Sequence, residues 1–362
     1  MRGIPEPSTT LKGNNVGGYE EDPQETPANV VAMLTEFSDI IDPEELPNRL
    51  SQLKWHITGF VDGDGSFPII LSPDAGKKFG WLIQPRFEVE LRRNEDSEVM
   101  LKVICRAMLI RPRIFAGENY VKLIVTNRRI LLEKVVPFFE KYRPAVKWLD
   151  FKIMSEVAQD LQQKRHLEYD GFKEIVRKIY SIPRDGETRR KWRFEDIVKD
   201  EEPPPPREDT RTRLPSGLVP LKHYVAGFID AEGSLGFAVN RETRSITPYL
   251  TITSSETDVL RKIRWLLGCG EISGGRLQIY GVDNIVNRVA PFLDRQKLIA
   301  KRTTYKMFKH ILETVVRGDH KRNFQETVEL VNMLNKTAGG SPETIRRAPS
   351  ANTGGEDMVQ HP

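Results

Sequence analysis

One segment of this chain occurs twice, and the repeat limits the possible folds more than any other feature. Adding 168 to a residue number in the first copy gives a residue of the same type in the second. The first copy contains Leu50, Leu53, Ile57, Gly59, Phe60, Val61, Asp62, Asp64, Gly65 and Ser66. The second contains Leu218, Leu221, Val225, Gly227, Phe228, Ile229, Asp230, Glu232, Gly233 and Ser234. A repeat of this length predicts two similar structural units.

A second pair of matching segments lies downstream of the first. The sequence Val136-Pro137-Phe138-Phe139 matches Ala290-Pro291-Phe292-Leu293, and Lys147 matches Lys301, with an offset of 154 in both cases. The second copy is therefore 14 residues shorter between its two matching segments. This pattern predicts two domains that diverged in their loops and are related by a pseudo-two-fold axis.

Changes in composition predict where the domains begin and end. The N-terminal segment is rich in Pro, Gly and acidic residues, and a run of four prolines follows Glu202. Such segments are typical of disordered tails and extended linkers. The predicted organisation is a disordered acidic tail at 1–45, a first domain at 46–180, a charged, proline-rich linker at 181–214, a second domain at 215–336 and a disordered tail at 337–362.

Hydrophobic periodicity predicts the elements within each domain. Alternating apolar and polar residues indicate strands with one buried face, and longer stretches with a 3.6-residue period indicate helices. The predicted strands are Arg86 to Arg92, Tyr120 to Val125, Tyr249 to Thr253 and Arg276 to Tyr280. The predicted helices are Val99 to Leu109, Ile130 to Tyr142, Val259 to Leu267 and Asn284 to Leu293. With the repeated segment as a first helix, each half becomes an α+β unit of αββαββα order.

The repeated helix also carries a row of small residues. Gly59 and Gly63 are four residues apart, and Gly227 and Ala231 match them in the second copy. A glycine inside a helix costs about 1 kcal/mol relative to alanine, so a compensating interaction is expected. Small residues four apart allow two helices to approach closely. The sequence therefore predicts that the two copies pack against each other in parallel.

Acidic residues end both copies, at Asp62 and Asp64 and at Asp230 and Glu232. Parallel packing would bring these four carboxylates together at two helix C-termini, where the helix dipole is already negative. A divalent cation would relieve the repulsion, and carboxylate and carbonyl oxygens suit Mg²⁺. A plain surface turn would be the favoured interpretation for a single copy, but the duplication favours a shared site.

The two motifs resemble a known family signature. Thr58 to Gly65 reads TGFVDGDG and Ala226 to Gly233 reads AGFIDAEG, which is similar to the signature of LAGLIDADG homing endonucleases in their single-chain, two-motif form. The resemblance extends from about Asn48 to Lys309. It implies saddle-shaped antiparallel sheets, with the two motif helices paired at the domain interface.

The resemblance also implies roles for individual residues. The last acid of each motif, here Asp64 and Glu232, would bind Mg²⁺ or Mn²⁺ and act in catalysis. The preceding residues, Gly63 and Ala231, would offer backbone oxygens to the metal. Asp62 and Asp230 are assigned a structural role at the helix ends. Lys147 and Lys301 fit the positions of basic residues near the scissile phosphates.

One position departs from the family pattern. Where relatives often carry a polar side chain that positions water, after the second strand, the alignment places Leu91 in the first copy and Ser254 in the second. The departure predicts that the first carboxylate site is the slower one.

The function implied by the resemblance is site-specific cleavage of double-stranded DNA that leaves short 3′ overhangs at a long, asymmetric site. Strand faces would supply recognition in the major groove. The candidate DNA contacts are Arg86, Glu88, Glu90, Arg92, Tyr120 and Lys122 in the first half and Tyr249, Thr251, Arg276, Gln278 and Tyr280 in the second. Two alternatives of the same fold stay open, namely a group I intron splicing helper that binds host intron RNA and a DNA-binding protein that does not cleave.

Charge and composition agree with a polyanionic partner and exclude other classes. Residues 1–47 hold ten acidic side chains against two basic ones, so the rest of the chain carries a net charge of +12. The two cysteines exclude a disulfide framework and a zinc-cysteine site. The six histidines show neither metal-ligand spacing nor the pattern of a Ser-His-Asp enzyme.

The sequence also bears on where the protein acts. No apolar run is long enough to span a membrane, so no membrane partner is expected, and both motifs in one chain predict a monomer. Acidic residues at Glu20 to Asp22 argue against an imported precursor. The resemblance implies an intron-encoded protein of a chloroplast or mitochondrion, and the lack of a transit peptide agrees with a gene in the organelle itself.

Overall fold

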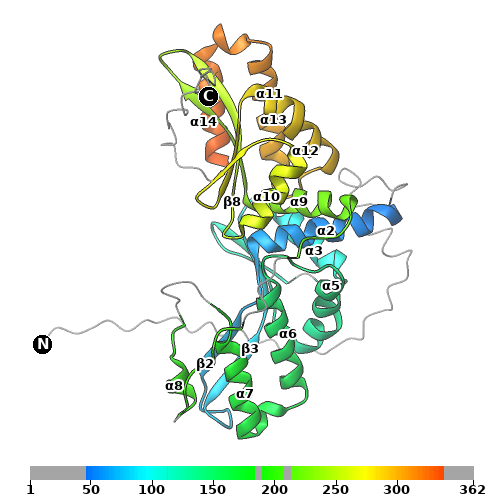
Figure 1. The fold of residues 1–362 in the computed structure, drawn as a ribbon, viewed down its shortest axis with the longest axis vertical. Helices are drawn as coiled ribbons and strands as arrows, with labels where there is room; N and C mark the ends of the chain where they lie inside the picture. The colour runs from blue at the N-terminus through cyan, green and yellow to red at the C-terminus, as the bar shows by residue number, and fades with distance from the viewer. Residues whose placement is uncertain (1–45, 112, 184–189, 200, 208–212, 338–362) are drawn as a thin grey trace, which may run out of the picture. The chain divides into compact units, whose positions relative to one another are not determined.

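The computed structural model describes residues 46–111, 113–183, 190–199, 201–207 and 213–337. The predicted disordered tails lie outside these residues, apart from Thr337 at the end of the last helix. The described elements fall into two halves of the same order (Figure 1). Within the described ranges, the longest helices lack the apolar length that crossing a bilayer requires.

The first half begins with the repeated helix and contains the strands β1 to β6, four of which form its larger sheet. Its elements are α2 (Leu46–Asp64), β1 (Gly65–Ser66), β2 (Ile69–Pro73), β3 (Trp81–Pro85), β4 (Phe87–Arg92), α3 (Glu95–Ala107), β5 (Ile114–Ala116), β6 (Tyr120–Val125), α4 (Arg128–Ile130), η2 (Leu131–Val135), α5 (Val136–Lys141), α6 (Trp148–Gln162), η3 (Arg165–Leu167), α7 (Tyr169–Tyr180) and α8 (Phe194–Ile197).

The second half follows the same plan with fewer elements. It contains α9 (Leu218–Glu232), β7 (Gly233–Asn240), β8 (Ser245–Thr253), α10 (Thr257–Leu267), β9 (Glu271–Ser273), β10 (Arg276–Tyr280), α11 (Val282–Asn284), η4 (Ile285–Val289), α12 (Ala290–Gln296), α13 (Arg302–Val316), η5 (Asp319–Lys321) and α14 (Phe324–Thr337).

Each half contains one four-stranded antiparallel sheet. The strand order is β1-β4-β6-β5 in the first sheet and β7-β8-β10-β9 in the second. The registers are equivalent, since Gly65 faces Val89 and Gly233 faces Ile252. The predicted α+β class, the antiparallel sheets and all four predicted strands are confirmed.

The prediction omitted several elements. A two-stranded sheet formed by β2 and β3 lies between β1 and β4 in the chain. A pair of packed helices follows each of the matching lysines, namely α6 with α7 after Lys147 and α13 with α14 after Lys301. In the second half, β7 and β8 form one uninterrupted hairpin instead.

The predicted helices at Ile130 to Tyr142 and Asn284 to Leu293 are present, but each contains a wide π-helical turn just before its proline region. Pro137 and Pro291 lack a backbone N–H, and their rings would clash with a carbonyl one turn earlier. A locally wider turn removes this conflict. The same sequence feature thus produces the same distortion in both halves.

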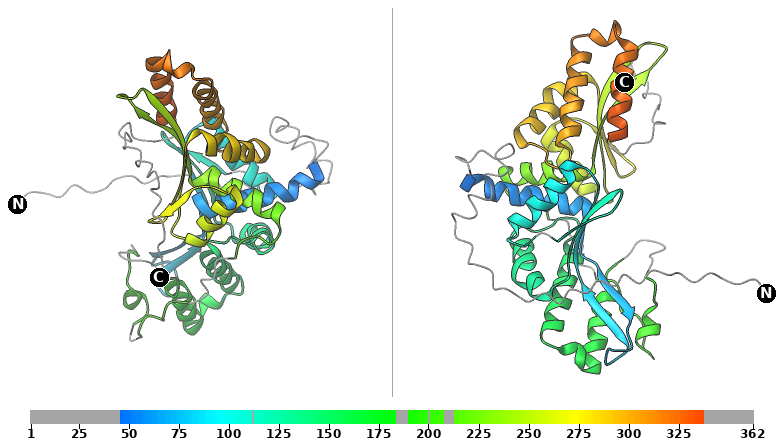
Figure 2. Two further views of the ribbon diagram at one scale, coloured as in Figure 1. Left: turned by 45° about the horizontal axis from the view of Figure 1, so that its top comes forward. Right: turned by 180° about the vertical axis from the view of Figure 1, so that it is seen from behind.

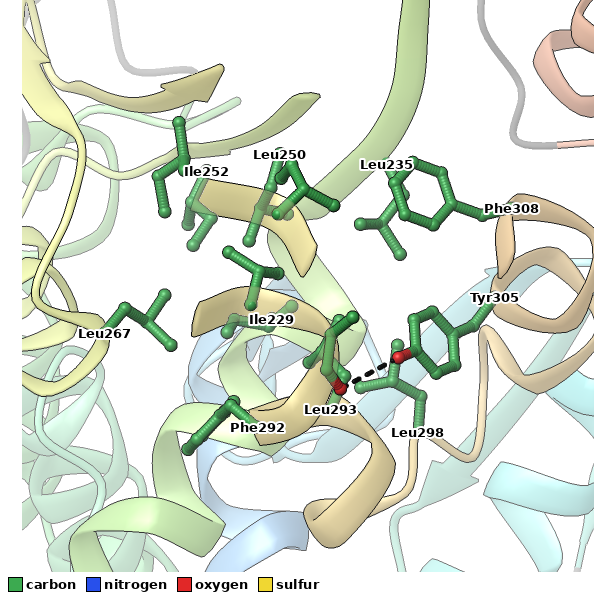
Figure 3. Close-up of a cluster of buried hydrophobic side chains, with 14 of the residues drawn as sticks. Ile229, Leu235, Leu250, Ile252, Leu267, Phe292, Leu293, Leu298, Tyr305 and Phe308 are labelled. Carbon is green, nitrogen blue, oxygen red and sulfur yellow. Dashed lines mark hydrogen bonds between the residues drawn. The ribbon is translucent and has the colours of Figure 1, made fainter. Parts of the chain in front are cut away.

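The core of the second half lies between its sheet and its helices. Ile229 from α9, Leu250 from β8, Leu293 from α12 and Phe308 from α13 are at most 1% exposed. Figure 3 shows these side chains converging, with the hydroxyl of Tyr305 donating to the carbonyl of Ala290. The core fixes the C-terminal end of α9 against the sheet and therefore positions Glu232.

The described part of the predicted linker contributes to a core as well. Phe194, Ile197 and Val198 are buried with α6, α7 and the β2–β3 hairpin in one hydrophobic cluster. These apolar residues lie among the charged and proline residues of 181–214 that indicated a linker. The exact domain boundaries stay a prediction.

The two repeated helices lie side by side in all views (Figures 1 and 2). A Cβ atom placed on Gly59 would lie 1.9 Å from the carbonyl oxygen of Tyr224, and one on Gly227 would lie 1.8 Å from that of His56. A Cβ on Gly63 would lie 2.4 Å from the Cβ of Ala231. The Gly63–Ala231 contact lies C-terminal to the other two contacts in both helices, so the helices run in the same direction, with their backbones in contact near the glycines.

We expect Gly59→Ala or Gly227→Ala to reduce the free energy of unfolding by about 3 kcal/mol or more, because each added methyl group meets rigid backbone of the other helix. Urea unfolding followed by circular dichroism measures this. Gly76→Ala is the matched control, because its Cβ would meet only the side chain of Asp74, at 3.2 Å. Equal stability losses in the three variants would contradict the close packing.

Candidate active site

Two carboxylates occupy the last positions of the paired helices. Asp64 ends α2 and Glu232 ends α9. Asp64 is exposed and Glu232 is half-buried. A Cβ atom on Gly63 would lie 3.5 Å from Oε1 of Glu232, so the Glu232 side chain lies against the end of α2. The structure therefore brings the two predicted catalytic acids together.

The other two acids face inward and bind backbone amides. Asp62 is 3% exposed and accepts hydrogen bonds from the amides of Ala145 and Lys147. Asp230 is 1% exposed and accepts from the amides of Ile299, Ala300 and Lys301. Through these hydrogen bonds, each aspartate holds the loop that precedes a lysine. The structural role predicted for Asp62 and Asp230 would consist in fixing these two loops.

The two lysines lie at the C-terminal ends of the repeated helices. Lys147 precedes α6, and its ammonium group donates to the carbonyls of Val61, Gly63 and Gly65. Lys301 precedes α13 and donates to the carbonyl of Ala231. A positive charge at a helix C-terminus is stabilising. The lysines thus offset part of the repulsion that the four carboxylates would otherwise cause.

Burial and mutual charge shift the acids and the lysines in opposite directions. The protein atoms around the carboxyl group raise the pKa of Asp64, which Lys301 and Lys147 oppose. Burial also raises the pKa of Glu232, and the negative charge of Asp64 raises it further. Burial lowers the pKa of Lys147 and of Lys301 despite the nearby carboxylates. Perturbed groups of both signs in one place are typical of active sites.

A pocket of about 190 Å³ opens beside Asp64. Residues of both halves line it, including Arg92 and Asn94 from the first half and Ser234, Lys301 and Thr304 from the second. The acid of one half and the lysine of the other therefore border the same space.

The available donors are the hard oxygens that a divalent cation prefers. Asp64 and Glu232 supply carboxylates, and the carbonyls of Gly63 and Ala231 lie at the same helix ends. Each carbonyl accepts a hydrogen bond from a lysine ammonium group and has a second lone pair that could bind a cation. Over the described ranges, no group of three or more His, Cys, Asp or Glu side chains surrounds a potential metal position, so further oxygen ligands would come from solvent or substrate.

Comparison with known proteins identifies the family. The family model described as LAGLIDADG endonuclease matches residues 57–158. The homing endonuclease I-ApeII of Aeropyrum pernix is 33% identical over 114 residues, which cover 28% of this chain and 68% of that protein. This chain belongs to the LAGLIDADG family.

Relatives of lower sequence identity cover more of the chain. The probable intron-encoded endonuclease 2 of Neurospora crassa is 24% identical over 305 residues, which cover 77% of this chain and 64% of the relative. The solved structure of the I-LtrWI LAGLIDADG homing endonuclease bound to target DNA covers 82% of this chain and 100% of that chain. Its TM-score is 0.67 at 23% identity, so it shows the same fold.

The predicted DNA contacts of this LAGLIDADG chain lie on one face of each sheet. In the first sheet Glu90 is opposite Lys122 and Arg92 is opposite Tyr120. In the second, the cross-strand pairs are Tyr249 with Tyr280, Thr251 with Gln278, and Thr253 with Arg276. Val89, Leu123, Leu250 and Leu277 are buried on the opposite faces.

The first sheet face carries a network of charges. Lys122 forms ion pairs with Glu88 and Glu90, both at 3.1 Å. Arg86 pairs with Glu88 at 3.2 Å and donates to the side-chain oxygen of Gln84. Sequence reasoning missed Gln84 because it lies in β3, outside the predicted strands.

The second sheet face carries an aromatic pair. The rings of Tyr249 and Tyr280 are 5.6 Å apart, and burial raises the pKa of Tyr249. The two halves of the LAGLIDADG fold therefore present different surfaces at equivalent positions.

The strand registers support the alignment of Leu91 with Ser254. Leu91 lies two residues after Val89, and Ser254 two residues after Ile252, which are themselves equivalent partners of Gly65 and Gly233. Leu91 borders the pocket beside Asp64. The first copy thus has an apolar side chain where the second has a hydroxyl.

We expect Asp64→Asn and Glu232→Gln to stabilise the metal-free protein at neutral pH. A carboxyl whose folded pKa is raised gives up stability as the pH rises through that pKa, so the charged forms destabilise the fold and neutral amides do not. Tm should rise by on the order of 1–3 °C in EDTA.

The difference should shrink as the pH falls and vanish below the ordinary pKa of each group, 3.8 for Asp64 and 4.5 for Glu232, because both carboxyls are then protonated in the folded and in the unfolded chain. Glu313→Gln, on the exposed face of α13, is the control and should leave Tm unchanged. A lower Tm for the two site variants at neutral pH would contradict the assigned shifts.

Proposed function

We propose that this chain is a site-specific endonuclease that hydrolyses both strands of double-stranded DNA. The observation that carries the proposal is the pair of carboxylates at the adjacent ends of two pseudo-symmetric helices, each accompanied by a half-buried lysine. Two equivalent acids at one pseudo-dyad suit two equivalent phosphodiester bonds on opposite strands. Short 3′ overhangs are the proposed product.

The relatives support this assignment of substrate. The name of the Neurospora crassa protein describes a probable intron-encoded endonuclease, and the I-LtrWI structure contains target DNA. This chain shares the fold of I-LtrWI and retains both acids of the repeated motif. We therefore infer double-stranded DNA as the partner and an organellar intron as the location of the gene.

In the proposed reaction Asp64 and Glu232 would hold Mg²⁺ or Mn²⁺, and each acid would serve one strand. A divalent cation held there would supply a more acidic water and charge stabilisation at the phosphate. Lys147 and Lys301 place positive charge beside the same phosphates. Burial lowers the pKa of both lysines, so they lose their protons at a lower pH than exposed lysines do. The raised pKa values of the two acids should make activity fall as the pH is lowered, because protonated carboxyls do not hold a cation.

Recognition is assigned to the exposed sheet faces. Arginine and glutamine side chains match guanine and adenine edges in the major groove, and glutamate accepts from cytosine. The first face offers the charged network around Glu88, and the second offers Tyr249, Tyr280 and Gln278. Different surfaces in the two halves favour an asymmetric target. Because one chain supplies both helices, a monomer suffices.

A plasmid library of candidate intron-insertion sites tests the proposal. With Mg²⁺, wild-type protein should linearise plasmids at one sequence, and Asp64→Asn and Glu232→Gln should each reduce double-strand cleavage at least about 100-fold. Glu313→Gln, far along α13, should cut like the wild type. Tight, specific binding without cleavage by the wild type would instead support a splicing helper or a non-cleaving DNA-binding protein.

A further inference from the structure

Two buried polar side chains at equivalent positions of the repeated helices each make a hydrogen bond to the other helix. These two hydrogen bonds are called the crossings below. His56 of α2 and Tyr224 of α9 are separated by the same offset of 168 as the repeat itself. His56 is 2% exposed and Tyr224 is fully buried. Each contacts the inward-facing aspartate of the other helix, so the two contacts are related by the pseudo-two-fold of the chain.

The first crossing ends at Lys147. The hydroxyl of Tyr224 donates to Oδ2 of Asp62 at 2.8 Å. Asp62 in turn accepts from the amides of Ala145 and Lys147, the latter at 2.9 Å. A side chain of the second half therefore fixes the carboxylate that holds the lysine loop of the first half.

The second crossing ends at Lys301. Nε2 of His56 lies 3.1 Å from Oδ2 of Asp230, and the imidazole donates because a carboxylate only accepts. Asp230 accepts from the amides of Ile299 and Lys301 at 2.7 and 2.9 Å. Here a side chain of the first half fixes the lysine loop of the second.

Packing follows the same crossed arrangement. Ala145, from the first lysine loop, is 4% exposed and belongs to the hydrophobic core of the second half. The first turn of α13, directly after Lys301, is tied to the first half, because Asp96 of α3 accepts from the amide and the hydroxyl of Thr303 at 2.6 and 3.2 Å. The chain segment around each lysine therefore also contacts the half that does not contain it.

We propose that His56 and Tyr224 are positioning residues, each of which sets the lysine of the opposite half through a buried aspartate. Tyr224 orients Lys147 through Asp62, and His56 orients Lys301 through Asp230. The two chemical centres are thus composites of both halves, and loss of one crossing weakens one centre only. The inference rests on the proposed function for its kinetic consequence but not for its structural one.

The structural consequence is measured by amide hydrogen exchange of the full chain without DNA. Tyr224→Phe removes one hydroxyl and should raise the exchange rate at Ala145 and Lys147 about three- to tenfold, with no change at Ile299 and Lys301. His56→Phe should show the reverse pattern. His56→Gln, whose amide nitrogen can take the position of Nε2, should restore protection.

The kinetic consequence is measured on the duplex recovered from the plasmid library, labelled differently on its two strands. Tyr224→Phe should slow the same strand that Lys147→Met slows, by about three- to tenfold, and His56→Phe the strand that Lys301→Met slows. The other strand should change less than about twofold in each case. Tyr180→Phe is the matched control, because its hydroxyl donates to the carbonyl of Trp192 at 2.6 Å, away from both loops.

The outcomes separate this inference from the proposed function. Equal slowing of both strands, or equal loss of protection in both loops, would reduce His56 and Tyr224 to packing residues and overturn the inference. If the wild type cuts no duplex while loop-specific exchange is observed, the nuclease assignment fails and the positioning role stands.

Discussion

The arrangement of the whole site depends on the direct contact between the backbones of α2 and α9. The absence of a side chain at Gly59 and Gly227 lets each helix approach a carbonyl of the other. This spacing brings Asp64 and Glu232 to one place, and it also lets Tyr224 reach Asp62 and His56 reach Asp230. With a wider separation, the acids would serve two independent sites and both crossed hydrogen bonds would be lost.

Close packing of two helix C-termini that carry four acids brings like charges together. Two sets of contacts reduce this repulsion. Asp62 and Asp230 turn inward and bind backbone amides, which satisfies buried carboxylates without a counter-ion. Lys147 and Lys301 then place positive charge on the terminal carbonyls. Burial raises the pKa of Asp64 and of Glu232, as it does that of Asp62, so the lysines offset the cost of bringing the acids together only in part.

The sequence was sufficient to predict the helix pair, the main strands and the meeting of the two acids, because a duplicated pattern constrains both copies at once. It was insufficient for the β2–β3 hairpin and for α8, where Phe194 and Val198 lie in a charged, proline-rich context. His56 and Tyr224 occupy equivalent repeat positions, but their chemical types differ, so a comparison by type passed over them. Only the three-dimensional contacts show that both donate to an aspartate of the other helix.

The two copies also show which parts of the fold can change and which cannot. Gly59 and Gly227 match because any side chain there meets backbone, and Asp62 and Asp230 match because each holds several amides. Leu91 and Ser254 differ although their strand registers are equivalent. The two sheet faces differ in the same way. Glu88, which forms an ion pair with Lys122, lies at the position equivalent to Thr251, and Thr251 is next to the Tyr249–Tyr280 pair. These differences lie where a side chain faces solvent, the pocket or the proposed DNA. Within the helix pair, the glycines and the inward-facing aspartates match, whereas His56 and Tyr224 differ in type and still make equivalent contacts.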